Sequence, residues 1–392
     1  MKRQDNYDQV YVVSGIQPSR KGAGKFISHF IDILTKENVN VKLFYLKTPE
    51  NKIVKTIKRL GLIKPIKELY YYFKRRDRSL ADISDSTIVL FHPQSLGLKN
   101  TKTMIENNDK IFYYVLDNFF FCKKSYNYIN KENNACLRCI KNIDESLKND
   151  CKPFPNYYSH QEYIRFIEYI TLKKEKITFL TQNKNQTLLL KKMFGNNVST
   201  IQLGMNTGEI EKNKDNDVNI NFVYDFLYHN TLSYAKGLSY FISLCNSLPE
   251  YKFVIPYSKH DVESLVGKLG LSNLSFIPCT WNNGLLELIN KTRITIVPSL
   301  WSAPVEGALL KSLYYSNAVA ILRSNFSFAD EIPADICIKL SDDFETNKSM
   351  LIDSIKNNTS LHDKSSRWVV DYAVSSDNEL IKFAKKHLRF YK

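Results

Sequence analysis

The segment between Ile294 and Leu322, ITIVPSLWSAPVEGALLKSLYYSNAVAIL, restricts the fold of this chain more than any other stretch. A β-branched run ends at Pro298, apolar residues recur at helical spacing from Val305, and a second apolar run follows at Ala318–Leu322. This pattern predicts a strand, a loop, a helix and a strand. In a parallel sheet, such a helix begins at the carboxyl end of a strand, where its free N–H groups and positive dipole end can hold phosphate. We therefore expect a phosphate-bearing ligand here.

Strand and helix patterns alternate in two series, which a polar stretch, Glu211–Asn219, separates. The first series opens with the strand pattern Gln9–Gly15 and the second with Asn221–Phe226. Repeated alternation predicts an α/β fold with two doubly wound sheets. The basic segment Asn378–Tyr391 has a helical pattern and is expected to pack back on the first domain. The predicted domains are residues 1–207 together with 371–392, including a cysteine-containing insertion at about 119–155, and residues 208–370.

The net charge of +15 is concentrated in the segment 52–78, where apolar stripes alternate with lysine and arginine. Basic amphipathic helices of this kind can lie on an anionic membrane surface. The alternative is an ordinary helix pair with a solvated basic face. The sequence has no zinc-finger, RRM or helix-turn-helix signature, so nucleic acid is not an expected partner.

Neither a signal peptide nor a membrane-spanning helix is expected. The basic start lacks a long apolar run, and no apolar run in the chain approaches the roughly 20 residues that a span requires. We therefore expect a cytoplasmic protein, which the basic segment 52–78 could attach peripherally to the inner face of a membrane.

Four of the seven cysteines lie in one polar stretch, at Cys122, Cys136, Cys139 and Cys151. A C-x-x-C pair flanked by two single cysteines can supply the four thiolates of a tetrahedral zinc site. A cytosolic location argues against disulfides. Two interpretations are therefore open, a structural zinc site and a set of free thiols.

Polar residues follow two buried-type strand patterns in the first half of the chain. His92 comes directly after Thr87–Phe91, and Asp117 follows Ile111–Leu116. Residues at such positions are commonly turn or cap residues. A functional interpretation of His92 and Asp117 depends on the resemblance described below.

Two further sites combine glycine with a turn between a strand and a helix. Gly22 and Gly24 lie in the first such turn, where glycine lets the backbone approach a ligand closely, although any turn of this type can use glycine. Lys236-Gly237 lies in the turn after the predicted strand Asn221–Phe226. A compact ammonium group beside a helix N-terminus suits a phosphate anion. The alternative for Lys236 is a solvated lysine in the first helical turn.

The run Pro298-Ser299-Leu300-Trp301, with Pro304 and the helix Glu306–Tyr314, resembles the donor-binding segment of retaining GT-B glycosyltransferases of family four. That segment usually reads P-S-x-W-x-E-P-F-G-L-x-x-L-E-A. The two glutamates of the pattern fall on Ala303 and Lys311, and Glu306 stands where glycine is common. The chain is here similar to a P-x-E-G-A-L-x-K-S variant of the segment.

The resemblance implies a GT-B fold, with two Rossmann-like domains facing a cleft. It implies transfer of a sugar, with retention, from a nucleotide-diphosphate donor to a glycan or lipid-linked glycan, as in bacterial surface polysaccharide synthesis. No cofactor is required for this chemistry. The resemblance places Glu306, His92 and Asp117 around the reacting groups, and Gly22, Gly24, Lys236, Gly237, Gly307, Ala308 and Lys311 around the donor.

Two rival functions are compatible with the same residues. A GT-B-fold sugar-nucleotide epimerase would use the same cleft without an acceptor, but its catalytic carboxylates are not recognisable in this sequence. A non-catalytic protein that binds nucleotide sugars as a scaffold would explain the loss of the glutamates at Ala303 and Lys311.

Overall fold

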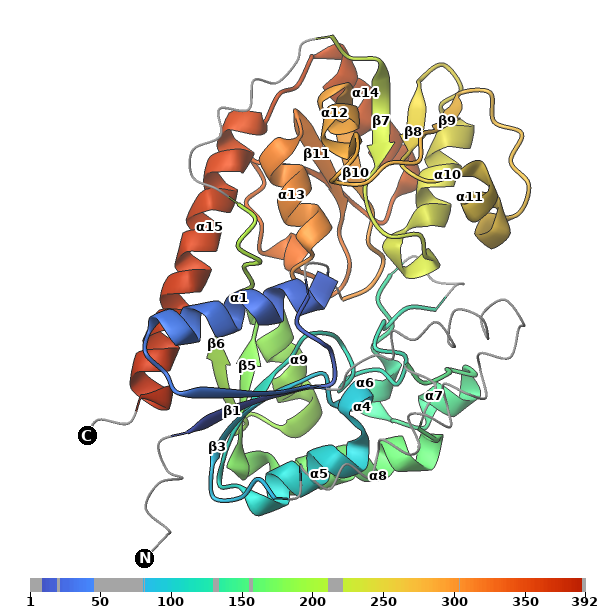
Figure 1. Ribbon diagram of the computed structural model, residues 1–392. Coiled ribbons are helices and arrows are strands. Elements are labelled where there is room, and N and C mark those ends of the chain that lie inside the picture. The colour runs from blue at the N-terminus through green and yellow to red at the C-terminus, as the bar shows by residue number, and fades with distance from the viewer. Residues whose placement is uncertain are drawn as a thin grey trace, which may run out of the picture. The chain divides into compact units, whose positions relative to one another are not determined.

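The computed structural model describes residues 9–19, 22–45, 80, 82–129, 134–154, 158–210, 221–302 and 304–389 (Figure 1). The basic segment 52–78, the polar stretch Glu211–Asn219 and Ala303 lie outside the described residues. By its contacts the chain divides into two compact units. The first comprises Met1–Tyr126, Leu137–Thr207 and Ser376–Lys392, and the second comprises Asn127–Cys136 and Gly208–Ser375.

The first unit contains a six-stranded sheet in the order β2-β1-β3-β4-β5-β6, with all neighbouring strands parallel. Its strands are β1 (Val10–Ser14), β2 (Val41–Tyr45), β3 (Thr87–Phe91), β4 (Lys110–Tyr114), β5 (Ile177–Thr181) and β6 (Ser199–Gln202). Its helices are α1 (Gly22–Lys36), α4 (Pro93–Leu96), α5 (Leu98–Asn107), α6 (Arg138–Lys141), α7 (Glu145–Lys148), α8 (His160–Lys173), the 3-10 turn η2 (Lys174–Lys176) and α9 (Lys184–Phe194).

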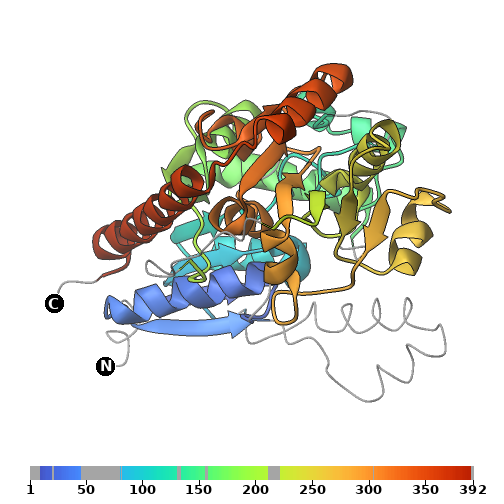
Figure 2. The same cartoon turned by 90° about the horizontal axis from the view of Figure 1, so that it is seen from above.

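Helices cover both faces of this sheet because its strands carry apolar side chains on both sides, as parallel sheets require. Tyr114 of β4 packs against Phe26 and Phe30 of α1, whereas the neighbouring Tyr113 packs toward Phe120, on the opposite face of the strand. Phe120 in turn contacts Phe194 of α9. Figure 2 shows α1 running beside β2.

The second unit contains a six-stranded parallel sheet in the order β12-β11-β10-β7-β8-β9. Its strands are β7 (Tyr224–Tyr228), β8 (Phe253–Ile255), β9 (Leu274–Phe276), β10 (Thr292–Val297), β11 (Ala318–Leu322) and β12 (Ile338–Leu340). Its helical elements are η3 (Tyr234–Lys236), α10 (Leu238–Ser247), α11 (Lys259–Val266), α12 (Leu285–Asn290), α13 (Gly307–Tyr315), η4 (Phe328–Asp330), α14 (Phe344–Lys356) and most of α15 (His362–Phe383).

The core of the second unit is also two-sided. Tyr228 of β7 packs against Phe241 of α10, while the adjacent Leu227 packs with Leu288 and Ile289 of α12. The end of α15, from Ser376, and the π-helical turn η5 (Ala384–Leu388) belong to the first unit. The two sheets confirm the predicted α/β fold with two doubly wound parallel sheets.

Candidate functional site

The strand order of the second unit reverses between β7 and β10. The chain winds outward from β7 to β9, returns to β10 beside β7, and then winds the other way. The loops after β7 and β10 therefore leave the sheet in different directions at its carboxyl edge, which is where doubly wound proteins bind ligands. A backbone hydrogen bond joins the two loops, from Leu300 N to Ala235 O at 2.9 Å, and another holds the loop after β7 against β10, from His229 N to Ile296 O at 3.1 Å.

Gly237 lies where these two loops come closest. Its φ of 74° is in the left-handed region, and a Cβ atom placed on it would be 1.8 Å from the carbonyl oxygen of Pro298. No side chain fits that space, so glycine is required for the loops to approach each other. Lys236, the residue before it, ends the 3-10 turn η3, which the Ser233 hydroxyl caps by accepting the Lys236 N–H.

Glu306 occupies the N-cap position of α13, but its side chain does not cap the helix. The carboxylate is buried and accepts hydrogen bonds from four side chains instead. Oε1 accepts from Trp301 Nε1 at 2.9 Å and from the Lys236 ammonium group. Oε2 accepts from Ser299 Oγ at 2.8 Å and from Asn230 Nδ2 at 3.0 Å. The loops after β7 and β10 thus converge on one carboxylate.

This surrounding keeps Glu306 ionised. Burial by itself would raise the pKa of the carboxyl group, but the charge of Lys236 and the hydrogen bonds from Lys236, Ser299 and Asn230 outweigh burial and lower it. The Lys236 ammonium group also lies 4.5 Å from the centre of the Trp301 ring, within the range of a cation–π contact. The site therefore holds a buried ion pair with an aromatic side chain against its cation.

The first N–H groups of α13 have no side-chain cap. Gly307 is the first helical residue, and a Cβ placed on it would meet no atom within 4 Å among the described residues. The amides of Gly307 and Ala308 precede the first intrahelical bond, which runs from Leu310 N to Glu306 O. Open space beside uncapped N–H groups is the geometry in which a helix N-terminus binds an anion.

Lys311 lies on the same helix and pairs with Glu209 at 2.8 Å, with its ammonium group 4.5 Å from the Trp281 ring centre. His229, just after β7, is buried and places Nδ1 2.7 Å from Ser312 Oγ. Burial, and then the charge of Lys311, lower the pKa of His229 to about 4, although Glu306 opposes them. The imidazole is therefore neutral at pH 7.

A small hollow of about 20 Å³ opens beside Glu306. The loop after β10 contributes Ser299 and Pro304 to its lining, and the loop after β11 contributes Ser327 and Phe328. A hollow of this size has room for about one water molecule or one ligand hydroxyl group.

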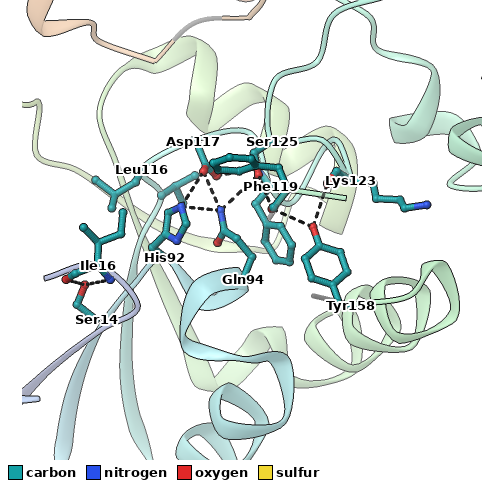
Figure 3. A network of polar contacts seen from close by, with 12 residues as sticks. Ser14, Ile16, His92, Gln94, Leu116, Asp117, Phe119, Lys123, Ser125 and Tyr158 are labelled. Atoms are coloured by element: carbon teal, nitrogen blue, oxygen red, sulfur yellow. Dashed lines mark hydrogen bonds and ion pairs between the residues drawn. The ribbon is translucent and has the colours of Figure 1, made fainter. Parts of the chain in front are cut away.

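The first unit has its own polar network at the carboxyl edge of its sheet, close to the point between β1 and β3 where the strand order reverses (Figure 3). Gln94 lies at its centre: Nε2 is 2.7 Å from Asp117 Oδ2, 3.1 Å from His92 Nε2 and 3.3 Å from Ser125 Oγ. His92 Nε2 is also 3.4 Å from Asp117 Oδ2. The structure thus brings His92 and Asp117 together, through a glutamine that the sequence did not single out.

Backbone geometry fixes His92 in this network. Its φ of 51° is left-handed, which is unusual for a residue other than glycine, and Pro93 begins α4 directly after it. A Cβ on Gly15 would lie 2.3 Å from the His92 carbonyl oxygen, so the loop after β1 requires glycine at this position. His92 Nδ1 and Gln94 Oε1 are buried without a hydrogen-bond partner among the described residues.

The structure gives the two predicted loop glycines different surroundings. Gly22 is the first residue of α1 and has a φ of 54°, and no described atom lies within 4 Å of a Cβ placed on it. A Cβ on Gly24 would meet the hydroxyl of Ser19 at 2.4 Å and the carbonyl oxygen of Gln17 at 2.6 Å. The loop before α1 therefore folds back against Gly24.

The structure does not support the predicted zinc site of Cys122, Cys136, Cys139 and Cys151. Among the described residues, no group of three or more histidine, cysteine, aspartate or glutamate side chains is placed to hold a metal ion. None of the four forms a disulfide. Burial, and then the nearby Cys139 and Cys151, raise the pKa of the Cys122 thiol and disfavour the thiolate that a zinc ion needs.

Several residues of both networks were not predicted from the sequence. Asn230 and Ser299 were not singled out because their role depends on a carboxylate that is 76 and 7 residues away along the chain. The signal for Asn230 was its position after a central strand, but the predicted strand Asn221–Phe226 ended too early to show it. Gln94 lies two residues after His92 and would have been accessible to the same argument about strand ends.

The chain matches no family model and no curated protein sequence. Its structure is similar to that of TarM, with a TM-score of 0.60 at 10% identity over 96% of this chain and 98% of the other. It is also similar to HepE (Alr3699) from Anabaena in complex with UDP, with a TM-score of 0.57 at 10% identity over 96% and 99%. For sucrose-phosphate synthase (Tll1590) from Thermosynechococcus elongatus the TM-score is 0.55 at 9% identity over 97% and 95%. The fold is therefore the two-domain, Rossmann-like GT-B fold.

Proposed function

We propose that this protein is a retaining glycosyltransferase similar to those of family four, which transfers a hexose-type sugar from a nucleotide-diphosphate donor to a glycan or lipid-linked glycan. The observation that carries the proposal is the buried, ionised Glu306 bound to Lys236 at the carboxyl edge of β7 and β10. Burying such a pair is costly, so its position beside uncapped amides and a hollow favours a role in binding over a role in folding.

The comparisons support the donor class. HepE, which shares this fold, has been crystallised with UDP and with UDP-glucose. A nucleotide diphosphate suits the second unit, where the Gly307 and Ala308 amides and the ammonium groups of Lys236 and Lys311 lie on or near α13. We therefore propose that the donor binds at the N-terminus of α13.

In this proposal the second unit stabilises the leaving group. When the bond between the sugar and the terminal phosphate breaks, negative charge grows on a phosphate oxygen. Preorganised N–H groups of α13 and the Lys236 ammonium group would stabilise that charge electrostatically. Glu306 would hold Lys236 in position, and a donor sugar hydroxyl at the hollow would replace one of the four groups that now donate to its carboxylate.

His92 and Asp117 would bind the sugar and the acceptor from the first unit, with Gly22 and Gly24 forming the loop that approaches the ligands. Gln94 keeps the two side chains within hydrogen-bonding distance of each other. An imidazole and a carboxylate in one network can orient a hydroxyl group and accept its proton.

A lipid-linked acceptor would bring the protein to a membrane, and we propose that the basic segment 52–78 makes that contact on the cytoplasmic face. Among the helices in the described part of the chain, none has the length and apolar composition needed to cross a bilayer. Binding to vesicles that contain anionic lipid, measured against neutral vesicles and a variant without the lysines and arginines of 52–78, tests this contact.

A panel of nucleotide sugars tests the function. Release of the nucleoside diphosphate only when an acceptor glycan is present supports a transferase, an isomerised donor supports an epimerase, and binding without turnover supports a scaffold. NMR of the anomeric proton in the product separates retention from inversion. The proposal fails if neither nucleoside diphosphates nor nucleotide sugars raise the melting temperature, because a ligand that binds the native state must stabilise it.

A further inference from the structure

The segment Asn127–Cys136 forms a short arm that belongs by its contacts to the second unit, whereas the chain on both sides of it belongs to the first. Its two ends are paired: Cys136 N donates to Asn127 O at 2.7 Å, and an isolated antiparallel bridge joins Tyr128 to Ala135. The two ends of the arm are therefore paired like the base of a β-hairpin, with Asn127 at one end and Asn134 near the other.

The two asparagines bind the backbone of two loops at the candidate donor site. Asn127 is fully buried, and its Oδ1 accepts a hydrogen bond from Ser302 N at 3.0 Å. Asn134 Oδ1 accepts from Asn325 N at 2.8 Å and from Ser324 Oγ at 3.3 Å. The Ser302 hydroxyl completes the connection by donating to Asn325 O. The arm, the loop after β10 and the loop after β11 are thus joined in a closed set of hydrogen bonds.

These loops form the walls of the hollow beside Glu306. The loop after β10 carries Ser299 and Glu306, and the loop after β11 carries Ser327 and Phe328. Phe326, in the second loop, has a φ of 58°, which is an unfavourable backbone conformation for an aromatic residue. A loop with such a residue keeps its shape only when surrounding contacts hold it, and Asn134 binds the residue just before it.

We propose that the arm is a brace for the donor site, and that Asn127 and Asn134 are positioning residues that set the spacing of the two loops around Glu306. The brace follows from the hydrogen bonds alone. Its effect on ligand binding rests on the proposed function, in which the hollow receives part of the nucleotide sugar.

Hydrogen exchange in the absence of ligand tests the brace directly. The amide of Ser302 in Asn127→Ala protein, and that of Asn325 in Asn134→Ala protein, should exchange about tenfold faster, because each loses its side-chain acceptor. In both variants the amides of β8 should exchange at the wild-type rate. In the control variant Asn246→Ala, which changes an exposed residue, the amides of Ser302 and Asn325 should also exchange at the wild-type rate. If Asn127→Ala does not fold, Asn134→Ala still decides the question, because Asn134 is less buried. Unchanged exchange in a folded variant overturns the brace.

Donor binding tests the positioning role. We expect Asn134→Ala to raise the KM for the nucleotide sugar about tenfold and to change kcat less than threefold. Asn134→Asp should restore KM to within about twofold, because a carboxylate oxygen can accept the same N–H and O–H groups. Faster exchange with an unchanged KM would overturn the positioning role. If wild-type protein binds no UDP and no nucleotide sugar, the proposed function fails, and the positioning role fails with it. The exchange experiment still shows whether the arm braces the two loops.

Discussion

The ammonium group of Lys236 is bound to the carboxylate of Glu306 and lies against the face of Trp301. The cation expected to contact phosphate is therefore neutralised by the glutamate that takes the place of the usual glycine. A diphosphate that binds at the N-terminus of α13 must share Lys236 with Glu306. Glu306 thus controls how strongly the cation attracts the donor.

Glu306→Gln should separate catalysis from binding. The amide keeps the size of the side chain but removes its charge, so Lys236 is free to pair with phosphate. We expect UDP to bind at least as tightly, as measured by calorimetry, while kcat falls about 100-fold because the lysine and sugar are no longer held in place. Glu287→Gln, which removes a carboxylate from an exposed pair with Lys291, is the matched control and should change neither quantity. If activity falls only in proportion to the amount of folded protein, Glu306 has a structural role only.

The coupling free energy between Lys236 and Glu306 should be larger than that of an ion pair on the surface. Removing one partner leaves a buried charge without compensation, so Lys236→Met should lower the free energy of unfolding by about 3–5 kcal/mol. The double variant with Glu306→Gln should recover part of that loss. The same cycle for Lys291→Met and Glu287→Gln should give a coupling energy of about 0.2–1 kcal/mol, because that pair is exposed. Urea unfolding measures both cycles, and equal coupling energies would contradict the importance of burial.

Gly237→Ala should be much more destabilising than Gly284→Ala. Both glycines have left-handed backbone conformations, with φ of 74° and 87°, so both substitutions carry the same kind of backbone penalty. A Cβ on Gly237 would also lie 1.8 Å from Pro298 O, whereas the nearest described atom to a Cβ on Gly284 is Cys279 Cβ at 3.8 Å. We expect a loss of about 1 kcal/mol for Gly284→Ala and of about 3 kcal/mol or more for Gly237→Ala in urea unfolding. Similar losses would mean that the loops can move apart at little cost.

The periodicity of the sequence predicted both sheets because parallel strands are buried on both faces and read as short apolar runs. Thr87–Phe91 and Ala318–Leu322 were predicted with their observed limits. The strand predicted at Asn221–Phe226 is observed at Tyr224–Tyr228. Asp225 lies within the strand in both cases, and its carboxylate accepts a hydrogen bond from Lys252 N at 2.8 Å. Contacts between side chains that are far apart along the sequence produce no periodic pattern. The pairing of Lys236 with Glu306 was therefore not predicted.

Most candidate residues came from the resemblance to a known family. Their contacts in the structure change the roles that we expect for them. Gly237 was expected at the donor, and the structure adds a packing requirement that is independent of any ligand. Lys311 was expected to add positive charge for phosphate, and it is already paired with Glu209. The clustering of four cysteines along the sequence predicted a zinc site. Cys139 and Cys151 do lie close enough to Cys122 to raise its pKa, but among the described residues no three potential ligands are placed to hold a metal ion.

Gln94→Met should reduce turnover without weakening the binding of the donor. The substitution keeps the length of the side chain but removes the N–H groups that bind Asp117 and Ser125. We expect kcat to fall about 10- to 100-fold, since His92 and Asp117 lose their common partner, while the Kd for UDP stays the same. Gln161→Met, on the exposed side of α8, is the control. A rise in the Kd for UDP equal to the fall in kcat would show that Gln94 acts on the donor or on folding generally.

His229 should make the protein sensitive to mild acid. Its pKa in the native protein is about 4, against an ordinary value of 6.5, because burial and Lys311 disfavour the charged form. Between these values the unfolded chain binds the proton and the native protein does not, so stability falls as the pH is lowered from about 6.5 toward 4. The full effect is about 3 kcal/mol, and it is absent above pH 6.5. Most of the loss between pH 6.5 and 5 should be absent in His229→Gln, measured by urea unfolding at each pH, but present in His260→Gln, which changes an exposed histidine. A smaller loss should remain from His387, because burial, Lys386 and Lys110 lower its pKa as well. Glu306 adds acid sensitivity only below its ordinary pKa of 4.5, because its native pKa is lower still. A slope above pH 5 that is as steep in His229→Gln as in the wild type would assign the effect to another group.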